Sequence, residues 1–368
     1  MPGETFGRDI RTLPGERCRC HWCRFRPALG FINVTAAFIQ SVLLAAAIYF
    51  ACEYFVNGVE WVGQRFRLGA TTTGTVLAAF GTALPESAVT FVAVVFGRDA
   101  AQKEIGVGAA LGGPLVLATI AYSVVGVALL WNRRRLGRSD GLLEVNHRRL
   151  SHDQAWFLAI FVVKVGLGLV AFAFKPALGV LFLAAYGAYL WREMRNDEPV
   201  VDECDLEPLK FRPHDPSPPL AWAALQTLVA LAVIGAASHA FVGRLETIAT
   251  GLGWAPQFVA LLLSPIATEL PETLNAVIWV RQGRERLALA NISGAMMIQA
   301  TIPSALGLFF TPWLFDHSLL AAGAVTAVAV AVLWLLCRRG NIRSGSLVPL
   351  ALLYVVFGVI VAVVTRGS

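Results

Sequence analysis

Long apolar stretches with few charges dominate this 368-residue chain and limit what it can fold into. Only 15% of the residues are charged, against roughly 25% in soluble domains. A helix needs about 18 or more apolar residues to cross a bilayer, and about ten stretches approach or exceed that length. We therefore expect an all-α polytopic membrane protein. Its expected spanning segments are residues 33–56, 68–96, 104–131, 155–173, 176–191, 219–241, 255–280, 286–311, 318–337 and 346–365.

The polar segments divide the chain into two halves of five helices each. The longest polar stretch, residues 192–218, is rich in acidic residues and ends in several prolines, which predicts a linker. The arginine-rich N-terminus predicts a polar tail rather than a cleaved signal peptide. The expected domains are a tail over residues 1–30, a first membrane repeat over 31–191, the linker over 192–218 and a second membrane repeat over 219–368.

One short motif occurs once in each half. Residues 81–86 read Gly-Thr-Ala-Leu-Pro-Glu, and residues 267–272 read Ala-Thr-Glu-Leu-Pro-Glu. The alignment has no gap from residues 53–86 against 239–272. Because five crossings is an odd number, the second half must enter the membrane in the opposite orientation. Inverted repeats of this kind are typical of secondary transporters, whose sites lie near the midplane where the repeats meet.

The motif supplies oxygen ligands at a depth where a charge is costly unless it faces a cavity. Thr82 and Glu86 are four residues apart, as are Thr268 and Glu272, so each pair shares a helix face. Glu269 joins the second pair, and each motif proline leaves main-chain carbonyls free. Carboxylates, hydroxyls and carbonyls suit a hard cation such as Ca²⁺. The absence of a Cys or His cluster beside them disfavours a soft transition metal.

Three carboxylates so close together in a low-dielectric pocket cannot all stay ionised without a cation. Protonation would therefore compete with metal binding, which is the basis of antiport. The chain has no GxxxxGK[ST] phosphate loop, so ATP is not the expected energy source.

The two motif segments resemble the α-repeats of the Ca²⁺/cation antiporter superfamily, which includes the Na⁺/Ca²⁺ exchangers. The resemblance covers both repeats and the ten-helix layout. It implies that Glu86 and Glu272 are the central Ca²⁺ ligands and that Thr82 and Thr268 contribute oxygens. Gln299, which follows the second motif on the next helix, is expected to reach the same cation.

This chain departs from the family pattern at the positions associated with Na⁺. Where the Na⁺/Ca²⁺ exchangers usually have a serine after the motif threonine, this chain has Ala83 and Glu269. The following helices usually carry Gly-Ser-Asn, and here the serine is replaced by Gly113 and by Ala295. Glu269 either supplies a further carboxylate for a single cation or carries the proton.

Loop charges predict the orientation in the membrane. Most loop arginines and lysines fall on one side if the N-terminus lies outside, which favours that topology over the opposite indication of the arginine-rich tail. The net charge of +6 therefore reports topology and not nucleic-acid binding. We expect a multi-pass protein of the cell membrane, in bacteria the inner membrane.

The sequence predicts a secondary-active antiporter that exports Ca²⁺ in exchange for Na⁺ or H⁺, with no resident cofactor. Na⁺/H⁺ exchange on the same scaffold is the closest alternative, and a cation channel is less favoured. A membrane hydrolase is disfavoured because no HExxH motif or nucleophile–base pair is present, so the chain is not expected to be an enzyme. One further polar residue, Lys164, lies midway along its predicted helix, where it either pairs with an acid such as Glu53 or extends to the interface.

Overall fold

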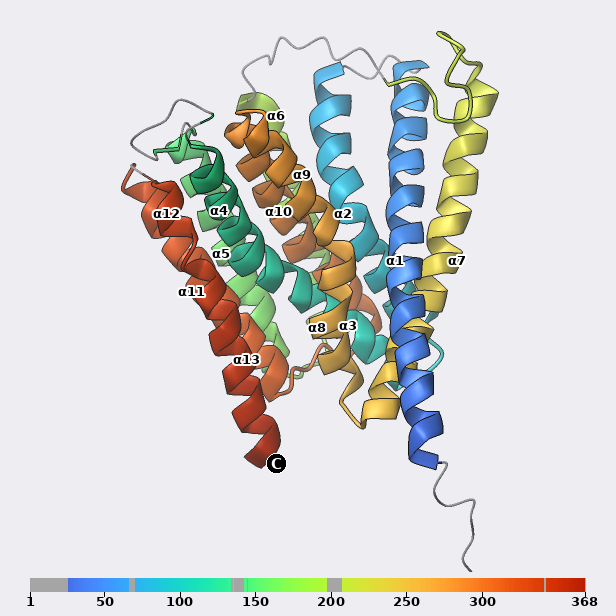
Figure 1. Ribbon diagram of the computed structural model, residues 1–368, viewed down its shortest axis with the longest axis vertical. Helices are drawn as coiled ribbons and strands as arrows, with labels where there is room; N and C mark the ends of the chain where they lie inside the picture. The colour runs from blue at the N-terminus through green and yellow to red at the C-terminus, as the bar shows by residue number, and fades with distance from the viewer. Residues whose placement is uncertain are drawn as a thin grey trace, which may run out of the picture.

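The computed structural model describes residues 26–65, 70–133, 135, 142–143, 145–196, 207–340 and 342–367. Most of the predicted N-terminal tail and residues 197–206 of the predicted linker fall outside these residues. The described part of the chain is helical, and six of its helical segments are long and apolar enough to cross a membrane. The other predicted crossings correspond to α2, α5, α6 and the α8–α9 pair (Figure 1).

The first half contains the five predicted crossings with small changes at their ends. The predicted third crossing is one continuous helical rod in which a π-helical turn joins α3 to α4. α1 begins at Arg26, inside the segment assigned to the tail. The elements are α1 Arg26–Arg65, α2 Ala70–Phe96, α3 Ala100–Val116, the π-turn Leu117–Ala121, α4 Tyr122–Asn132, α5 His147–Gly168, a 3₁₀ turn Lys175–Leu178 and α6 Gly179–Asn196.

The second half repeats this order, with one difference at the motif. In the first half α2 continues through Pro85, whereas the second motif interrupts its helix at Glu269. Pro271 then occupies the first turn of the new helix, where its missing N–H costs nothing. The elements are α7 Leu220–Leu252, α8 Pro256–Thr268, α9 Leu270–Arg281, α10 Glu285–Phe310, α11 His317–Arg338, α12 Ser344–Leu347 and α13 Leu350–Gly367.

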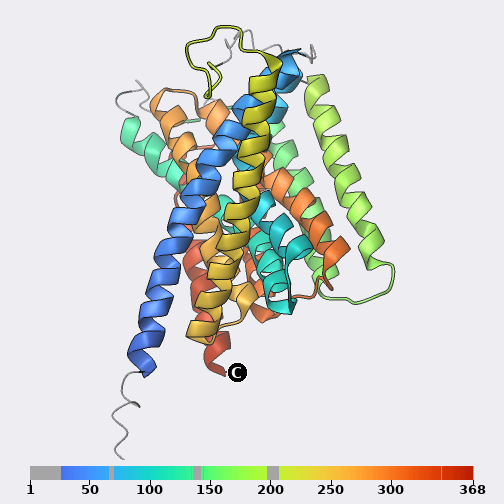
Figure 2. The same ribbon diagram turned by 90° about the vertical axis from the view of Figure 1, so that its right-hand side faces the viewer.

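The two ends of the helical bundle carry different parts of the chain. α1 begins and α13 ends at one end, whereas the described part of the linker lies at the opposite end, above the start of α7 (Figures 1 and 2). This placement agrees with five crossings before the linker and five after it.

Local signals in the sequence define several helix ends. The side chains of Asp99, Asn146 and Asp316 accept hydrogen bonds from backbone N–H groups in the first turns of α3, α5 and α11. Gly253 ends α7 with a φ of +67°, a conformation that strongly favours glycine. Helix starts and stops are therefore encoded locally, although the packing is not.

Two apolar cores lie side by side, and α2, α3 and α8 contribute to both. The smaller core joins α1, α2, α3, α7 and α8, and α1 lies along α7 over much of its length (Figures 1 and 2). The larger core is formed mainly by α3, α4, α5, α10, α11 and α13. The two motif-bearing helices, α2 and α8, thus lie at the boundary between the cores.

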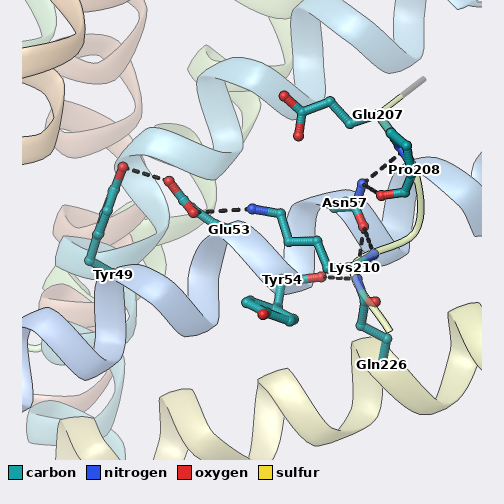
Figure 3. Close-up of polar contacts among 8 residues, drawn as sticks. All are labelled: Tyr49, Glu53, Tyr54, Asn57, Glu207, Pro208, Lys210 and Gln226. Carbon is teal, nitrogen blue, oxygen red and sulfur yellow. Dashed lines mark hydrogen bonds and ion pairs between the residues drawn. The ribbon is translucent and has the colours of Figure 1, made fainter. Parts of the chain in front are cut away.

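The described end of the linker folds back onto α1 and α7. Asn57 on α1 accepts a hydrogen bond from the backbone N–H of Lys210 at 3.0 Å and another from the Gln226 side chain on α7 at 3.0 Å (Figure 3). Leu209 is fully buried in a small cluster with Trp61 and Ala223. This part of the linker is therefore a packed connection and not a loose one.

Candidate cation-binding site

Three carboxylates lie in the interior at the boundary between the two cores. Glu86 on α2 is 1% exposed, and Glu269 and Glu272, at the α8–α9 break, are both 0% exposed. The interruption at Glu269 gives this residue a backbone outside both helices and puts Glu272 in the first turn of α9. A helix N-terminus favours negative charge, so the break also provides a suitable position for a carboxylate.

A hydrogen bond between side chains connects the two repeats. The hydroxyl of Thr268 lies 2.5 Å from Glu86 Oε2, and Ser264, one turn earlier on α8, donates to the same oxygen at 3.4 Å. Thr268 also lies 3.2 Å from Glu269 Oε1. Thr268 of the second repeat thus donates a hydrogen bond to Glu86 of the first repeat and lies between the carboxylates of Glu86 and Glu269.

Gln299 holds the Glu269 carboxylate in place. Its amide Nε2 lies 2.8 Å from each carboxylate oxygen of Glu269. Because both contacts use the amide nitrogen, the amide oxygen of Gln299 faces elsewhere, and it has no hydrogen-bond partner among the described residues. Glu272 makes no hydrogen bond with Glu86 or Glu269, but it interacts electrostatically with both.

Several buried oxygens around these groups lack a hydrogen-bond partner within the described part of the chain. They are Glu86 Oε1, Glu272 Oε1, Glu272 Oε2 and Gln299 Oε1. Buried polar atoms are nearly always paired, and leaving one unpaired costs about 1–3 kcal/mol, more if it is charged. The unpaired oxygens come from both repeats and are all acceptors, which is the donor set that a hard cation requires.

Two glycines allow α3 to approach this cluster closely. A Cβ atom on Gly113 would lie 2.7 Å from Gln299 Oε1 and 3.1 Å from Glu269 Oε1, and one on Gly112 would lie 2.5 Å from the Leu261 carbonyl of α8. Gly113 stands where the exchanger pattern has a serine. The space beside it is occupied by the Gln299 side chain, so the loss of the serine and the presence of Gln299 are structurally connected.

The expected pairing of Lys164 with Glu53 is wrong. Lys164 on α5 is fully buried, and its Nζ donates to the carbonyls of Ala110 at 2.7 Å and Gln299 at 3.2 Å. Glu53 instead contacts Lys210 of the linker, with 3.1 Å between Glu53 Oε2 and Lys210 Nζ. The carbonyls of α3 and α10 can satisfy the ammonium inside the bundle, so it neither reaches Glu53 nor extends to an interface.

Of the predicted site residues, the structure brings together Glu86, Glu269, Thr268 and Gln299 and places Glu272 beside them. Thr82 lies on α2, but its side chain is outside the described residues. Ser264 was not predicted, although its position four residues before Thr268 is a signal that could have found it. Across the described residues, no group of three or more His, Cys, Asp or Glu side chains is placed so that it could hold a metal ion. Neutral oxygens must therefore contribute to any cation site here.

Comparison with known proteins gives consistent results. A profile of the sodium/calcium exchanger protein family matches residues 36–194 and 222–363, thus most of both halves. The chain is 26% identical over 322 residues to a protein of Alkalimonas amylolytica named "Putative antiporter CaxA", covering 84% of this chain and 92% of that one. It is 24% identical over 337 residues to the inner membrane protein YrbG of Escherichia coli strain K12, covering 87% and 96%.

Solved exchanger structures share the fold. The sodium-calcium exchanger NCX_Mj aligns with a TM-score of 0.54 and 18% identity, covering 88% of this chain and 97% of that one. The H⁺/Ca²⁺ exchanger CAX aligns with a TM-score of 0.60 and 15% identity, covering 93% and 92%. These matches support the ten-helix architecture of two inverted repeats that the sequence predicts.

Proposed function

The chain belongs to the sodium/calcium exchanger family, a family of membrane cation antiporters and not of enzymes, and from this we propose that it exports Ca²⁺ in exchange for Na⁺ or H⁺. The proposed site comprises Glu86, Glu272, Glu269, Thr82, Thr268 and Gln299. Each repeat contributes one motif threonine and one motif glutamate, and the second repeat adds Glu269 and Gln299.

The observation that carries this proposal is the set of unpaired buried oxygens shared between the repeats. Glu86 Oε1, both oxygens of Glu272 and Gln299 Oε1 lack partners among the described residues. A cation among them would satisfy these oxygens together and offset the cost of burying the carboxylates. The set contains no sulfur or imidazole nitrogen, which favours Ca²⁺ over a transition metal.

The counter-ion follows from the competition between a cation and protons for the same carboxylates. When the cation leaves, buried neighbouring carboxylates take up protons or bind Na⁺. Relatives of this fold are named for each partner, a sodium-calcium exchanger and an H⁺/Ca²⁺ exchanger. Here Gly113 and Ala295 replace the serines of the exchanger pattern, and the loss of these two hydroxyls favours H⁺ as the counter-ion.

Na⁺/H⁺ exchange is the second candidate, and the same replacement supports it. A site with fewer hydroxyl ligands has fewer oxygens to complete the shell of six to eight that Ca²⁺ takes. A smaller shell suits a monovalent cation that alternates with a proton on the same carboxylates. The two candidates differ in one measurable property, the transport of Ca²⁺ itself.

Alternating access would use the inverted repeats. The site lies where α2 of one repeat meets α8 and α9 of the other, so movement of one repeat against the other would expose it to each face in turn. The Thr268–Glu86 hydrogen bond crosses this boundary and would have to break and re-form as the site empties and fills.

Tracer flux in reconstituted vesicles tests the proposal. Purified protein in proteoliposomes is given external ⁴⁵Ca²⁺ with an opposing Na⁺ gradient, an opposing pH gradient or no gradient. Glu86→Gln and Glu272→Gln remove one carboxylate from each repeat, and Glu104→Gln, at an exposed position on α3, is the matched control. We expect gradient-driven uptake in the wild type and in Glu104→Gln and its loss in both site variants.

Three other outcomes have distinct meanings. Uptake that persists in Glu86→Gln and Glu272→Gln would remove these residues from the site. Uptake without any gradient dependence would indicate a channel. If neither gradient moves Ca²⁺ but Na⁺ gradients move protons in the same vesicles, the second candidate replaces the first.

We also propose the orientation in the membrane. α6, α9 and α11 end on the side of the bundle where the linker lies (Figure 1), and Arg195, Arg281 and Arg338 are in their last turns. Positive residues concentrate on the cytoplasmic side of membrane proteins. The protein is a multi-pass membrane protein, and this charge distribution supports a cell-membrane location with a cytoplasmic linker and the N-terminus outside.

A further inference from the structure

A polar cluster on α1 lies outside the proposed transport site and is not used by it. Glu53, with a side chain that is 38% exposed, accepts a hydrogen bond from the Tyr49 hydroxyl at 2.6 Å and contacts the Lys210 ammonium at 3.1 Å (Figure 3). The same ammonium lies 5.4 Å from the centre of the Tyr54 ring. A carboxylate, a phenol oxygen and an aromatic face together form an environment that attracts a cation.

We propose that Glu53, Tyr49 and Tyr54 form an access site for the transported cation on the linker side of the protein, and that Lys210 occupies this site as a tethered competitor. The inference rests on the proposed function, since it concerns the ion that the antiporter moves.

The position of the cluster on α1 links it to the transport site. Tyr49, Cys52 and Glu53 are three and four residues apart, so they share one face of α1. Tyr49 and Cys52 lie close enough to Glu272 to interact with its charge. Glu272 is fully buried, whereas Glu53 is partly exposed beside the linker, so this face of α1 connects the transport site to the linker end.

The docking of the linker onto α1 and α7 does not depend on the Lys210 side chain. The contacts use backbone groups instead. Trp61 donates to the Glu207 carbonyl at 3.0 Å, and the N–H of Phe211 donates to the Gln226 side chain at 2.8 Å. Asn57 binds the backbone of Lys210 itself. The ammonium is therefore free to leave Glu53 on its flexible stem while the backbone stays in place.

The contact between Lys210 and Glu53 is weak. Both partners are partly exposed, 26% for Lys210 and 38% for Glu53, and ion pairs of this kind contribute little to stability. An incoming cation can displace the ammonium without unfolding the linker. Lys210 would then raise the concentration of cation needed at this face and leave the opposite face unaffected.

Transport measured separately at the two faces tests the inference. Vesicles with the linker face outward and vesicles with it inward are assayed for the half-saturating Ca²⁺ concentration at about 0.15 M ionic strength, which screens general surface charge. Lys210→Met keeps the length of the stem and removes the charge. We expect Lys210→Met to lower the half-saturating Ca²⁺ concentration at the linker face about two- to fivefold, with no change at the other face. This factor corresponds to the free energy that an exposed ion pair contributes.

Three further variants separate competition from a structural role. Lys210→Arg keeps the charge and should behave like the wild type. Arg212→Met removes a charge from the same linker, at a residue that contacts Asp215 and Trp222 instead of Glu53, and should change neither value. In a Glu53→Gln background, Lys210→Met should produce no additional shift because the competed carboxylate is gone.

The inference is overturned by a shift of equal size in Arg212→Met, by an equal shift at both faces, by a shift that persists without Glu53, or by no shift at all. Each of these outcomes leaves wild-type Ca²⁺ exchange intact and so leaves the proposed function standing. If the wild type exchanges no Ca²⁺ under either gradient, the proposed function fails and the inference fails with it.

Discussion

In the candidate site, Thr268 connects the two repeats. Its hydroxyl binds Glu86 of the other repeat and also lies beside Glu269, so one side chain contacts two carboxylates. A hydrogen bond to a charged group contributes about 1.5–3 kcal/mol. The free energy of this single contact is therefore large enough to affect the geometry of the site.

Replacing Thr268 with valine keeps the shape of the side chain and removes the hydroxyl. We expect Thr268→Val to lower the efficiency of Ca²⁺ exchange about tenfold to a hundredfold, the factor that corresponds to one charge-assisted hydrogen bond. Initial rates of tracer uptake over a range of Ca²⁺ concentrations measure this efficiency. Thr268→Ser restores a hydroxyl and should retain most of it, and an unimpaired Thr268→Val would exclude the residue from the site.

Gly113 tests the close approach of α3 to the site. A Cβ at this position would press against Gln299 and Glu269, so we expect Gly113→Ala to displace the Gln299 amide and weaken Ca²⁺ exchange at least severalfold. Gly166 on α5 has no atom within 4 Å of the corresponding position and is the matched control. Tracer uptake by Gly166→Ala should equal that of the wild type, and equal uptake by Gly113→Ala would contradict the packing described for Gln299.

Part of the site could be predicted from the sequence, and the reason is the repeat. The duplicated motif pointed to Glu86, Glu272 and Thr268, which the structure places close together, because residues four apart share a helix face. It did not identify Ser264, because the corresponding position in the first repeat is Ala78 and gives no duplicated signal. The partners of Lys164 could not be predicted either, since its acceptors are backbone carbonyls of α3 and α10 and every residue type carries one.

At the scale of the elements, the apolar runs predicted where the helices lie better than where they begin and end. α7 extends to Leu252, beyond the predicted end at residue 241, because the residues that follow remain compatible with a helix until Gly253. The motif prolines predicted a local loss of helical hydrogen bonds, but not that α2 would continue through Pro85 while the second motif breaks at Glu269. The π-turn at Leu117–Ala121 was not predicted, because no local signal in the sequence marks it.

The end of α7 gives a prediction about stability. Gly253 has a φ of +67°, so Gly253→Ala should cost about 1 kcal/mol of stability. Gly243 lies in the interior of the same helix, and no atom lies within 4 Å of an added Cβ there. Gly243→Ala should therefore stabilise the protein. Thermal unfolding in detergent should show opposite shifts for the two variants, and shifts of the same sign would contradict the assignment of the helix end.

At the scale of the whole molecule, the inverted repeats place the linker and the chain ends at opposite ends of the bundle. Ser217 lies in the linker, so we expect a membrane-impermeant thiol reagent to reach a cysteine introduced there only from the cytoplasmic side. A cysteine at Arg98, in the exposed turn between α2 and α3, should react only from the outside. Both tests use a chain in which the native cysteines have been replaced. Labelling of both positions from the same side would contradict the ten-helix arrangement.

In the proposed mechanism, both repeats build a single cation site jointly. Calorimetric titration of purified protein with Ca²⁺, in buffers of different ionisation enthalpy, measures the number of sites and the protons released on binding. We expect one class of site, proton release on binding, and loss of that site in Glu86→Gln and in Glu272→Gln alike, with Glu104→Gln unchanged. Ca²⁺ binding that survives in either variant with unaltered affinity would show that the two glutamates do not share a site.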